Sequence, residues 1–175
     1  MNLKITIIIG FAKMTDYANL KIVLAEEGLI MFQTEYTLVL VKPDGIQSHH
    51  LGEIITRIER KNYQITALKM IEASEDQLRR HYSDKVNQSF FPELIHYMQE
   101  GPIVGIVVAG TNVVKEIRKM AGATNPGDAT LGTIRADFGR EWPDGVMRNV
   151  VHTSDSVANA QREIKIWFPE LKLAK

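Results

Sequence analysis

A nine-residue stretch near the end of the chain combines a histidine with small polar side chains that could handle a phosphoryl group. Residues 148–156 read RNVVHTSDS. The imidazole of His152 keeps a free lone pair near neutral pH, so it could act as a nucleophile. Residues 154–156 are predicted to cap the last helix, and a helix N-terminus favours negative charge. A phosphoryl group beside His152 would therefore be stabilised, although a histidine at a strand end is also often purely structural.

A carboxylate in the last predicted helix could orient this histidine. Glu163 follows His152 by eleven residues, and eleven residues make about three helical turns, so Glu163 can lie on the same side of the helix as its start. A carboxylate bound to one ring nitrogen would fix the tautomer and leave the other nitrogen free to attack. Whether Glu163 reaches the ring depends on the path of the chain between them.

Three cationic residues and a threonine supply what a polyphosphate needs. Lys42 follows an apolar run, Arg118 and Arg135 lie in polar segments, and Thr124 begins a Thr-Asn-Pro turn. Each of these residues alone is more typical of a solvated surface or a turn. Together they are significant, because arginine pairs bidentately with phosphoryl oxygens and lysine adds a point charge. The combination predicts a polyphosphate ligand.

Composition narrows the class of protein and the chemistry. The chain has 175 residues, of which 45% are apolar and 24% charged, which is typical of one globular domain. Lys plus Arg and Asp plus Glu both number 21, so no global field favours nucleic acid or an anionic membrane. There is no cysteine, which excludes disulfides, thiolate metal sites and cysteine nucleophiles.

Alternating periodicities predict the elements that position these residues. Residues 42–45 (KPDG) form a turn after the first strand, and Ser74 with Gln77 forms a capping box. We expect strands at residues 36–41, 64–71, 103–109 and 150–151, and helices over residues 51–58, 74–82, 91–98, 113–120 and about 155–167. The last helix should bury Val157, Ala160, Ile164 and Trp167. This order predicts an α+β, ferredoxin-like sandwich: a four-stranded antiparallel sheet with helices packed on one face.

The N-terminal segment differs from the rest. We place a boundary near Phe32, with an extension over residues 1–33 and the domain over residues 34–175. The apolar run 5–12 is shorter than the ~18 residues that cross a bilayer. A secretory signal would need a small-residue cleavage pattern, which is missing after this run. The extension is therefore interpreted as a variable segment, or as the result of a start codon upstream of a functional start at Met31.

Seven ordered motifs carry a resemblance to a known family. They are K-P-D-G at 42–45, H-Y at 81–82, F-F-P at 90–92, G-P at 101–102, T-N-P at 124–126, G-T-I-R-x-D-F at 132–138 and R-N-V-V-H-x-S-D-S at 148–156. With these motifs, residues 34–168 resemble a nucleoside diphosphate kinase. The resemblance implies the same ferredoxin-like fold that periodicity predicts. It also implies transfer of the γ-phosphate of a nucleoside triphosphate, mainly ATP, to a nucleoside diphosphate.

The resemblance implies a set of catalytic residues. His152 would be the nucleophile that becomes phosphohistidine in a ping-pong mechanism, and Glu163 would orient its ring. Ser154 would hydrogen-bond Glu163 behind the histidine. Tyr82 would lie beside the reacting centre, and Lys42 would contact both the ribose hydroxyl and the transferred phosphoryl group.

The resemblance also implies phosphate and ribose contacts. Arg118, Thr124 and Arg135 match the positions that hold the β- and γ-phosphates. Asn149 matches the contact to the ribose 3′-hydroxyl. Mg²⁺ is the implied cofactor, carried by the nucleotide phosphates with no protein ligand predicted, since this cation keeps most of its waters.

The implied base slot is shallow. Phe90 would stack on the base, and Leu94 and Val146 would complete the slot. Because no side chain is assigned to read the base edge, we expect purine and pyrimidine, ribo and deoxyribo substrates to react.

The resemblance also predicts partners and a cellular location, and two other functions compete with it. The resemblance implies a cytoplasmic homo-oligomer (dimer, tetramer or hexamer), a phosphoprotein of nucleotide metabolism with no membrane or specific nucleic-acid partner. An RNA-binding sheet is the first alternative, but it needs exposed aromatics and a basic surface. A catalytically weak family member acting as a scaffold is the second alternative, which loss of the nucleophile or the arginines would indicate.

Three positions depart from the family pattern. Thr153 replaces a small residue after the histidine, and β-branching restricts the backbone there. The loop between Arg135 and Asn149 is a few residues longer and contains residues 142–145 (WPDG). His49 and His50 form a pair that lacks a third ligand for a metal.

Overall fold

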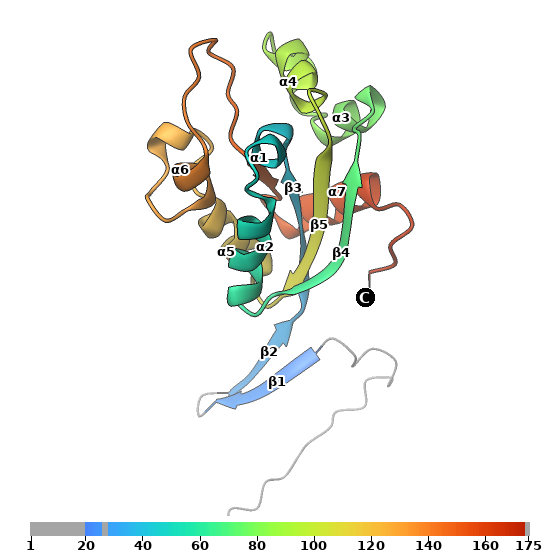
Figure 1. The fold of residues 1–175 in the computed structure, drawn as a ribbon. Coiled ribbons are helices and arrows are strands. Elements are labelled where there is room, and N and C mark those ends of the chain that lie inside the picture. The colour runs from blue at the N-terminus through green and yellow to red at the C-terminus, as the bar shows by residue number, and fades with distance from the viewer. Residues whose placement is uncertain (1–19, 26–27, 174–175) are drawn as a thin grey trace, which may run out of the picture. The chain divides into compact units, whose positions relative to one another are not determined.

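The computed structural model describes residues 20–25 and 28–173, which divide into two compact units. In the N-terminal unit, β1 (Leu20–Ala25) pairs with β2 (Gly28–Gln33) in an antiparallel ribbon. The second unit spans Thr34–Lys172 and contains the other helices and strands of the described residues (Figure 1). The apolar run 5–12, considered above as a signal, lies outside the described residues.

A four-stranded antiparallel sheet forms the centre of the second unit. Its strands are β3 (Glu35–Val41), β4 (Gln64–Ile71), β5 (Ile103–Gly110) and β6 (Val151–Thr153), in the order β4-β5-β3-β6. β5 reads IVGIVVAG and β3 carries Leu38 to Val41 without interruption, so both are apolar enough to be buried on both faces. The predicted sheet is confirmed, and the strand expected at 150–151 is found at Val151–Thr153.

Eight short helical segments surround the sheet. They are α1 (Pro43–Gln47), α2 (Leu51–Arg60), α3 (Glu75–His81), α4 (Phe91–Met98), α5 (Val113–Ala121), the 3-10 turn η1 (Pro126–Asp128), α6 (Ile134–Phe138) and α7 (Val157–Trp167). The capping box that begins α3 is confirmed: Gln77 N donates to Ser74 Oγ, and Ser74 N donates to Gln77 Oε1. No helix in the described part of the chain has the length and apolarity to cross a membrane.

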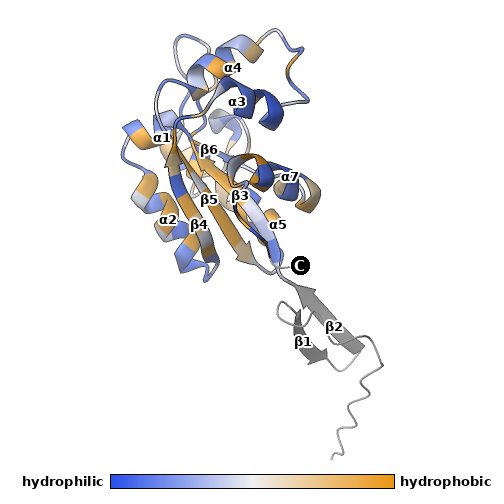
Figure 2. Ribbon diagram, turned by 90° about the vertical axis from the view of Figure 1, so that its right-hand side faces the viewer, coloured by the Kyte–Doolittle hydropathy of each residue, from blue (hydrophilic) through white to orange (hydrophobic). Residues whose placement is uncertain are grey.

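Helices cover both faces of the sheet, so the expectation of helices on one face is wrong. Val39 and Val41 pack with Ile54 and Ile58 of α2 in the main core cluster. The opposite face meets the end of α7, because a Cβ on Gly105 would lie 3.1 Å from the Phe168 ring. Figure 2 shows α2 and α7 on opposite sides of the strands. The continuous apolar character of β3 and β5 requires this second layer.

One predicted core residue lies at the surface. Ala160, Ile164 and Trp167 of α7 are buried as expected, but the side chain of Val157 is 40% exposed. Val157 is the first residue of α7 and lines a surface cavity instead of the core. The buried stripe of α7 therefore begins at Ala160, one turn later than the spacing predicted.

Candidate active site

A cavity of about 780 Å³ opens where the strand ends of β3 and β6 meet α3, α4 and α7. Eleven predicted site residues line it: Lys42, Tyr82, Phe90, Leu94, Arg118, Thr124, Arg135, Val146, Asn149, His152 and Glu163. Ser154 is fully buried and does not line the cavity. The structure thus brings together residues that are as much as 121 positions apart in the chain (163 − 42).

His152 is held by one ring nitrogen and exposes the other. It lies on the edge strand β6, opposite Leu40 of β3. Its Nε2 is 3.1 Å from Glu163 Oε2, and no hydrogen bond to Nδ1 is found among the described residues. Burial, together with repulsion from Lys42 and Arg135, lowers the pKa of His152 to about 3. The ring is therefore neutral near pH 7, with Nδ1 available as a nucleophile.

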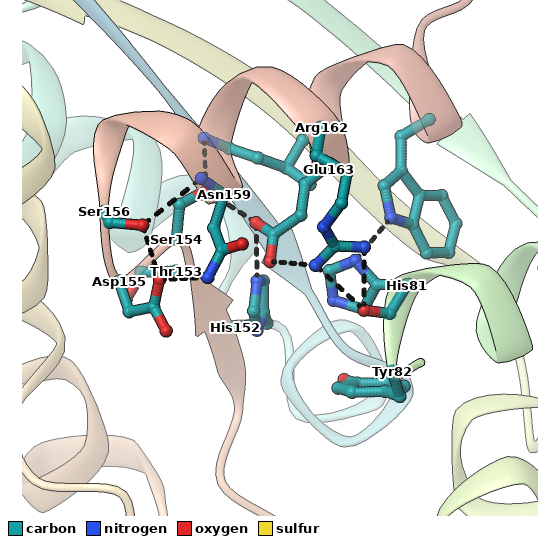
Figure 3. A network of polar contacts seen from close by, with 12 residues as sticks. His81, Tyr82, His152, Thr153, Ser154, Asp155, Ser156, Asn159, Arg162 and Glu163 are labelled. Atoms are coloured by element: carbon teal, nitrogen blue, oxygen red, sulfur yellow. Dashed lines mark hydrogen bonds and ion pairs between the residues drawn. The ribbon is translucent and has the colours of Figure 1, made fainter. Parts of the chain in front are cut away.

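A second hydrogen-bonded layer fixes the carboxylate behind the histidine (Figure 3). Ser154 Oγ donates to Glu163 Oε2 over 2.6 Å and accepts from the Leu38 backbone N–H over 3.2 Å. Ser154 is thereby tied to the central strand β3. Burial raises the pKa of Glu163, so its ionised form depends on these donors.

Lys42, Asn149 and Thr124 form a hydrogen-bonded chain along the cavity. Lys42 Nζ donates to Asn149 Oδ1 over 2.7 Å, and Asn149 Nδ2 donates to the Thr124 carbonyl over 2.8 Å. Burial lowers the pKa of Lys42 to about 7, with Asp44 opposing the shift. The Lys42 amine is therefore only partly charged near pH 7, and an anionic partner would favour its charged form.

Two guanidinium groups bind the strand on either side of His152. Arg135 donates to the carbonyls of Val151 and Gly122 over 2.8 and 2.9 Å. Arg118, which is more exposed, donates to the Thr153 carbonyl over 3.5 Å. Burial and repulsion from Arg118 lower the pKa of Arg135 to about 10, so it still carries its charge at neutral pH. Two guanidinium groups are therefore anchored to the residues that flank His152 and line the same cavity.

A strained residue sets the path of the chain into β6. Val150 has φ of +65°, a left-handed conformation that a β-branched residue rarely adopts. Its N–H donates to Asp44 Oδ2 over 3.0 Å, and its carbonyl accepts from the Lys42 N–H over 2.8 Å. Asp44 also accepts from the Tyr97 hydroxyl over 2.7 Å. The turn after β3 therefore holds the strand of the histidine in place.

Comparison with known proteins identifies this arrangement. A sequence model described as nucleoside diphosphate kinase matches residues 35–173. Nucleoside diphosphate kinase A of Canis lupus familiaris is 49% identical over 138 residues, which cover 79% of this chain and 88% of that protein. Nucleoside diphosphate kinase 3 of Mus musculus is 48% identical over 139 residues, covering 79% of this chain and 80% of that protein. The chain belongs to the nucleoside diphosphate kinase family.

Solved structures of nucleoside diphosphate kinases have the same fold. The enzyme from Encephalitozoon cuniculi matches with a TM-score of 0.72 and 36% identity, over 77% of this chain and 88% of that chain. The enzyme from Aquifex aeolicus matches with a TM-score of 0.72 and 35% identity, over 77% and 95%. These matches confirm the predicted α+β, ferredoxin-like fold. As a member of this family the chain is a nucleotide phosphotransferase.

The predicted base slot lies at the mouth of the cavity. Phe90 is 47% exposed, while Leu94 and Val146 are half-buried. Met147 and Glu93 line the same region, and sequence reasoning missed both. Arg148 ties the longer loop to the end of α4, with ion pairs to Asp144 at 2.7 Å and Glu100 at 3.0 Å.

The other departures from the family pattern have simple structural settings. Thr153 is buried in β6 opposite Val39, and extended backbone suits a β-branched residue. His50 stacks on Phe138 with ring centroids 4.3 Å apart. Among the described residues, the metal-ligand type cluster involves His81, His152 and Glu163 and does not include the His49–His50 pair.

Sequence reasoning gave no role to three residues that shape the site. Asp44 and Tyr97 form the clamp on Val150, and His81 is buried directly against the His152 ring. Asp44 and His81 belong to the K-P-D-G and H-Y motifs, so a signal for both was present in the sequence. Tyr97 had no such signal, because it lies outside the seven motifs.

Proposed function

We propose that this chain transfers the γ-phosphate of a nucleoside triphosphate, mainly ATP, to a nucleoside diphosphate through phosphohistidine at Nδ1 of His152. The observation that carries the proposal is the 3.1 Å contact between His152 Nε2 and Glu163, which leaves Nδ1 as the free nitrogen. Nδ1 attacks the γ-phosphorus, the bond from that phosphorus to the bridging oxygen breaks, and the diphosphate leaves with the bonding electron pair. A β-phosphate oxygen of the second diphosphate then attacks the phosphohistidine and regenerates the neutral ring.

The cationic side chains supply positioning and charge stabilisation. Arg118, Thr124 and Arg135 would hold the β- and γ-phosphates, which a phosphoryl transfer needs in line with the nucleophile. Lys42 and Asn149, already hydrogen-bonded to each other over 2.7 Å, would contact the ribose hydroxyls. Lys42 would also approach the transferred group, and Tyr82 would border the reacting centre.

A broad slot for the base supports broad specificity. The half-exposed Phe90 offers one aromatic face for stacking, with Leu94 and Val146 beside it. Stacking accepts any base, so purine and pyrimidine nucleotides should all react.

The residues of the cavity fit Mg²⁺ bound through the nucleotide. Lys42, Arg118 and Arg135 line the cavity, and the carboxylate of Glu163 is engaged by Ser154 and His152. Mg²⁺ prefers oxygen ligands and keeps its waters, so Arg118, Thr124 and Arg135 would hold it indirectly, through the phosphates. The cation would neutralise charge on the phosphates during transfer.

A homo-oligomer also forms part of the proposal. The outer strand β4 leaves Leu68 and Met70 47% and 59% exposed, which supports burial of this strand in an assembly. Light scattering would distinguish dimer, tetramer and hexamer from a monomer. A cytoplasmic location remains a prediction.

The deciding experiment follows the transfer of a labelled phosphate from ATP to the protein. The purified protein is incubated with γ-labelled ATP and Mg²⁺, and the adduct is treated with acid, base, GDP and CDP. We expect an acid-labile, base-stable label that GDP or CDP removes. His152→Ala should abolish it, while His96→Ala, at an exposed position of α4, should retain it. Label that survives acid or persists in His152→Ala rules out the histidine route, and a protein that never labels favours the scaffold alternative.

A further inference from the structure

A buried histidine next to the nucleophile has a hydrogen-bond donor without an acceptor. His81 is 2% exposed, and its Nδ1 lies 3.1 Å from the indole Nε1 of Trp167. An indole nitrogen only donates, so Nδ1 of His81 must be the acceptor and Nε2 must carry the proton. Nε2 has no hydrogen-bond partner in the described part of the chain. A buried donor without a partner destabilises the folded protein and calls for an explanation.

The unpaired donor lies inside the catalytic cluster. The rings of His81 and His152 meet edge to face with centroids 4.3 Å apart. A ring nitrogen of each and a carboxylate oxygen of Glu163 all lie within 4.8 Å of one another. Figure 3 shows His81 beside His152, Glu163 and Arg162. The environment of Glu163 therefore includes His81 as well as Ser154.

Three such residues could suggest a metal site, but the tautomer argues against it. Trp167 occupies the lone pair on Nδ1 of His81, and the proton occupies Nε2. A neutral imidazole in this state has no lone pair left for a cation. The same state presents the positive end of an N–H dipole, which suits an anion.

We propose that His81 is a positioning residue: Trp167 fixes it as the neutral Nε2–H tautomer, and that N–H dipole keeps the buried Glu163 ionised so that Glu163 holds His152. The proposal rests on the proposed function of His152. Glu163 needs such support, because the cation nearest to it among the described ion pairs, Arg162, lies 3.7 Å from Oε1, beyond hydrogen-bond distance. Burial raises the pKa of Glu163, so the ionised carboxylate depends on the polar groups that lie close to it.

Several charged or titratable groups face His81 from the elements around it. They are His152 on β6, Glu163 and Arg162 on α7, Lys42 at the end of β3 and Tyr82 at the end of α3. Burial, with the cationic groups, holds the pKa of His81 well below its ordinary value, so it stays neutral across the working range. Arg162 also donates to the His81 carbonyl over 3.3 Å, which fixes its backbone.

The first test reads the tautomer directly in the full-length wild-type protein. Nitrogen-15 NMR of labelled histidines should show His81 protonated on Nε2 and without titration between pH 5 and 8. A proton on Nδ1, or a titration in this range, overturns the proposal. This measurement does not depend on catalysis.

The second test measures kcat/KM for ATP against pH in four variants. Trp167→Phe removes the indole donor, and His81→Asn keeps an acceptor near the Nδ1 position but loses the Nε2 donor. Both variants should shift the acid limb of the kcat/KM profile upward by about one pH unit. Below this limb kcat/KM should be about tenfold lower than in the wild type, and at pH 8.5 it should be close to the wild-type value. His81→Gln places an amide near the Nε2 position and should recover part of the shift. Trp142→Phe is the matched control, since the Trp142 indole N–H has no partner among the described residues, and it should change nothing.

The outcomes separate this proposal from the function itself. An unchanged acid limb in Trp167→Phe and His81→Asn, or an equal loss at every pH, overturns the positioning role while His152 still labels. Absence of phosphohistidine in the wild type overturns the proposed function, and the NMR result then stands alone. If a variant does not fold, the wild-type tautomer still decides.

Discussion

Burial acts on His152 and Lys42 in the same direction with different chemical results. It lowers the pKa of His152 to about 3, so the ring remains an uncharged nucleophile under all ordinary conditions. It lowers the pKa of Lys42 to about 7, so this side chain is only partly charged in the free protein. The same dry environment therefore creates a nucleophile and a cation whose charge depends on the ligand.

The shifted Lys42 predicts proton uptake on nucleotide binding. A triphosphate favours the charged form of Lys42 and raises its pKa, so binding at pH 8 should take up nearly one proton, and affinity should fall as pH rises above 7. At pH 6 Lys42 already carries its proton, and its uptake disappears. Calorimetry in buffers of different ionisation enthalpy measures this. Lys42→Met should lose the uptake and the exposed Lys61→Met should keep it; equal uptake in both would refute the assignment.

Ser154 predicts a coupled change of stability and pH dependence. Ser154→Ala leaves the Leu38 N–H without its 3.2 Å acceptor and removes the 2.6 Å donor to Glu163. We expect a loss of about 1–3 kcal/mol in the free energy of unfolding. The pKa of Glu163 should rise further, moving the acid limb of kcat/KM upward.

Ser156→Ala is the matched control for Ser154. Ser156 Oγ accepts from Asn159 N at the start of α7 and does not contact Glu163. Its loss should cost about 1 kcal/mol through the helix cap and leave the acid limb in place. Urea unfolding and pH profiles compare the two variants. An identical pH profile for both would remove the special role of Ser154.

Among the elements, α1 and β6 depend on each other most closely. The turn that begins α1 supplies Asp44 to the strained Val150, and Val150 leads into the strand of His152. The backbone of α1 must therefore approach Val150 closely, which requires a residue without a side chain at Gly45.

Two glycines predict opposite effects of the same substitution. A Cβ on Gly45 would lie 3.0 Å from Val150 Cγ1 and 3.2 Å from its carbonyl oxygen, so Gly45→Ala should destabilise by about 1–3 kcal/mol and lower kcat. A Cβ on Gly52 in α2 meets nothing within 4 Å, so Gly52→Ala should stabilise by about 0.5 kcal/mol. Urea unfolding tests both. Equal effects would show that space around Gly45 is not the constraint.

In the molecule as a whole, every residue of the candidate site lies in the unit Thr34–Lys172. Equal numbers of acidic and basic residues, 21 each, leave no net charge, while Lys42, Arg118 and Arg135 bring positive charge together at the cavity. A small polyphosphate fits such a local field better than an extended nucleic acid does.

The N-terminal unit is predicted to be dispensable for catalysis. A chain that begins at Met31 contains the whole second unit and should keep the urea midpoint of its sheet and its kcat/KM. Expression of both chains, followed by unfolding and the labelling assay, tests this. A shortened chain that is insoluble or loses most of its activity would show that residues 1–30 belong to the functional domain.

Much of the fold was predictable because strong periodicities have local causes. The apolar runs of β3 and β5 and the capping box of α3 were recognised correctly from short windows of sequence. The turn expected at residues 42–45 is instead the start of the short helix α1, because Pro43 suits the first position of a helix. The second helical layer was missed, because the same apolar run is compatible with one covered face or two. Val157 was misplaced for a related reason: spacing defines a helix face but not where the neighbouring layer ends.

The candidate residues His152, Lys42, Arg118 and Arg135 were also recognisable, since their side-chain types suit phosphate chemistry and the motifs preserve their order. Their assembly around one cavity was not, because it depends on contacts between segments far apart in the chain. The sequence by itself determined which donors, acceptors and charges are available, since those are covalent properties. Only the tertiary structure decided which nitrogen of His152 is free, how far burial moves each pKa, and that Trp167 sets the tautomer of His81, because these follow from distance and desolvation.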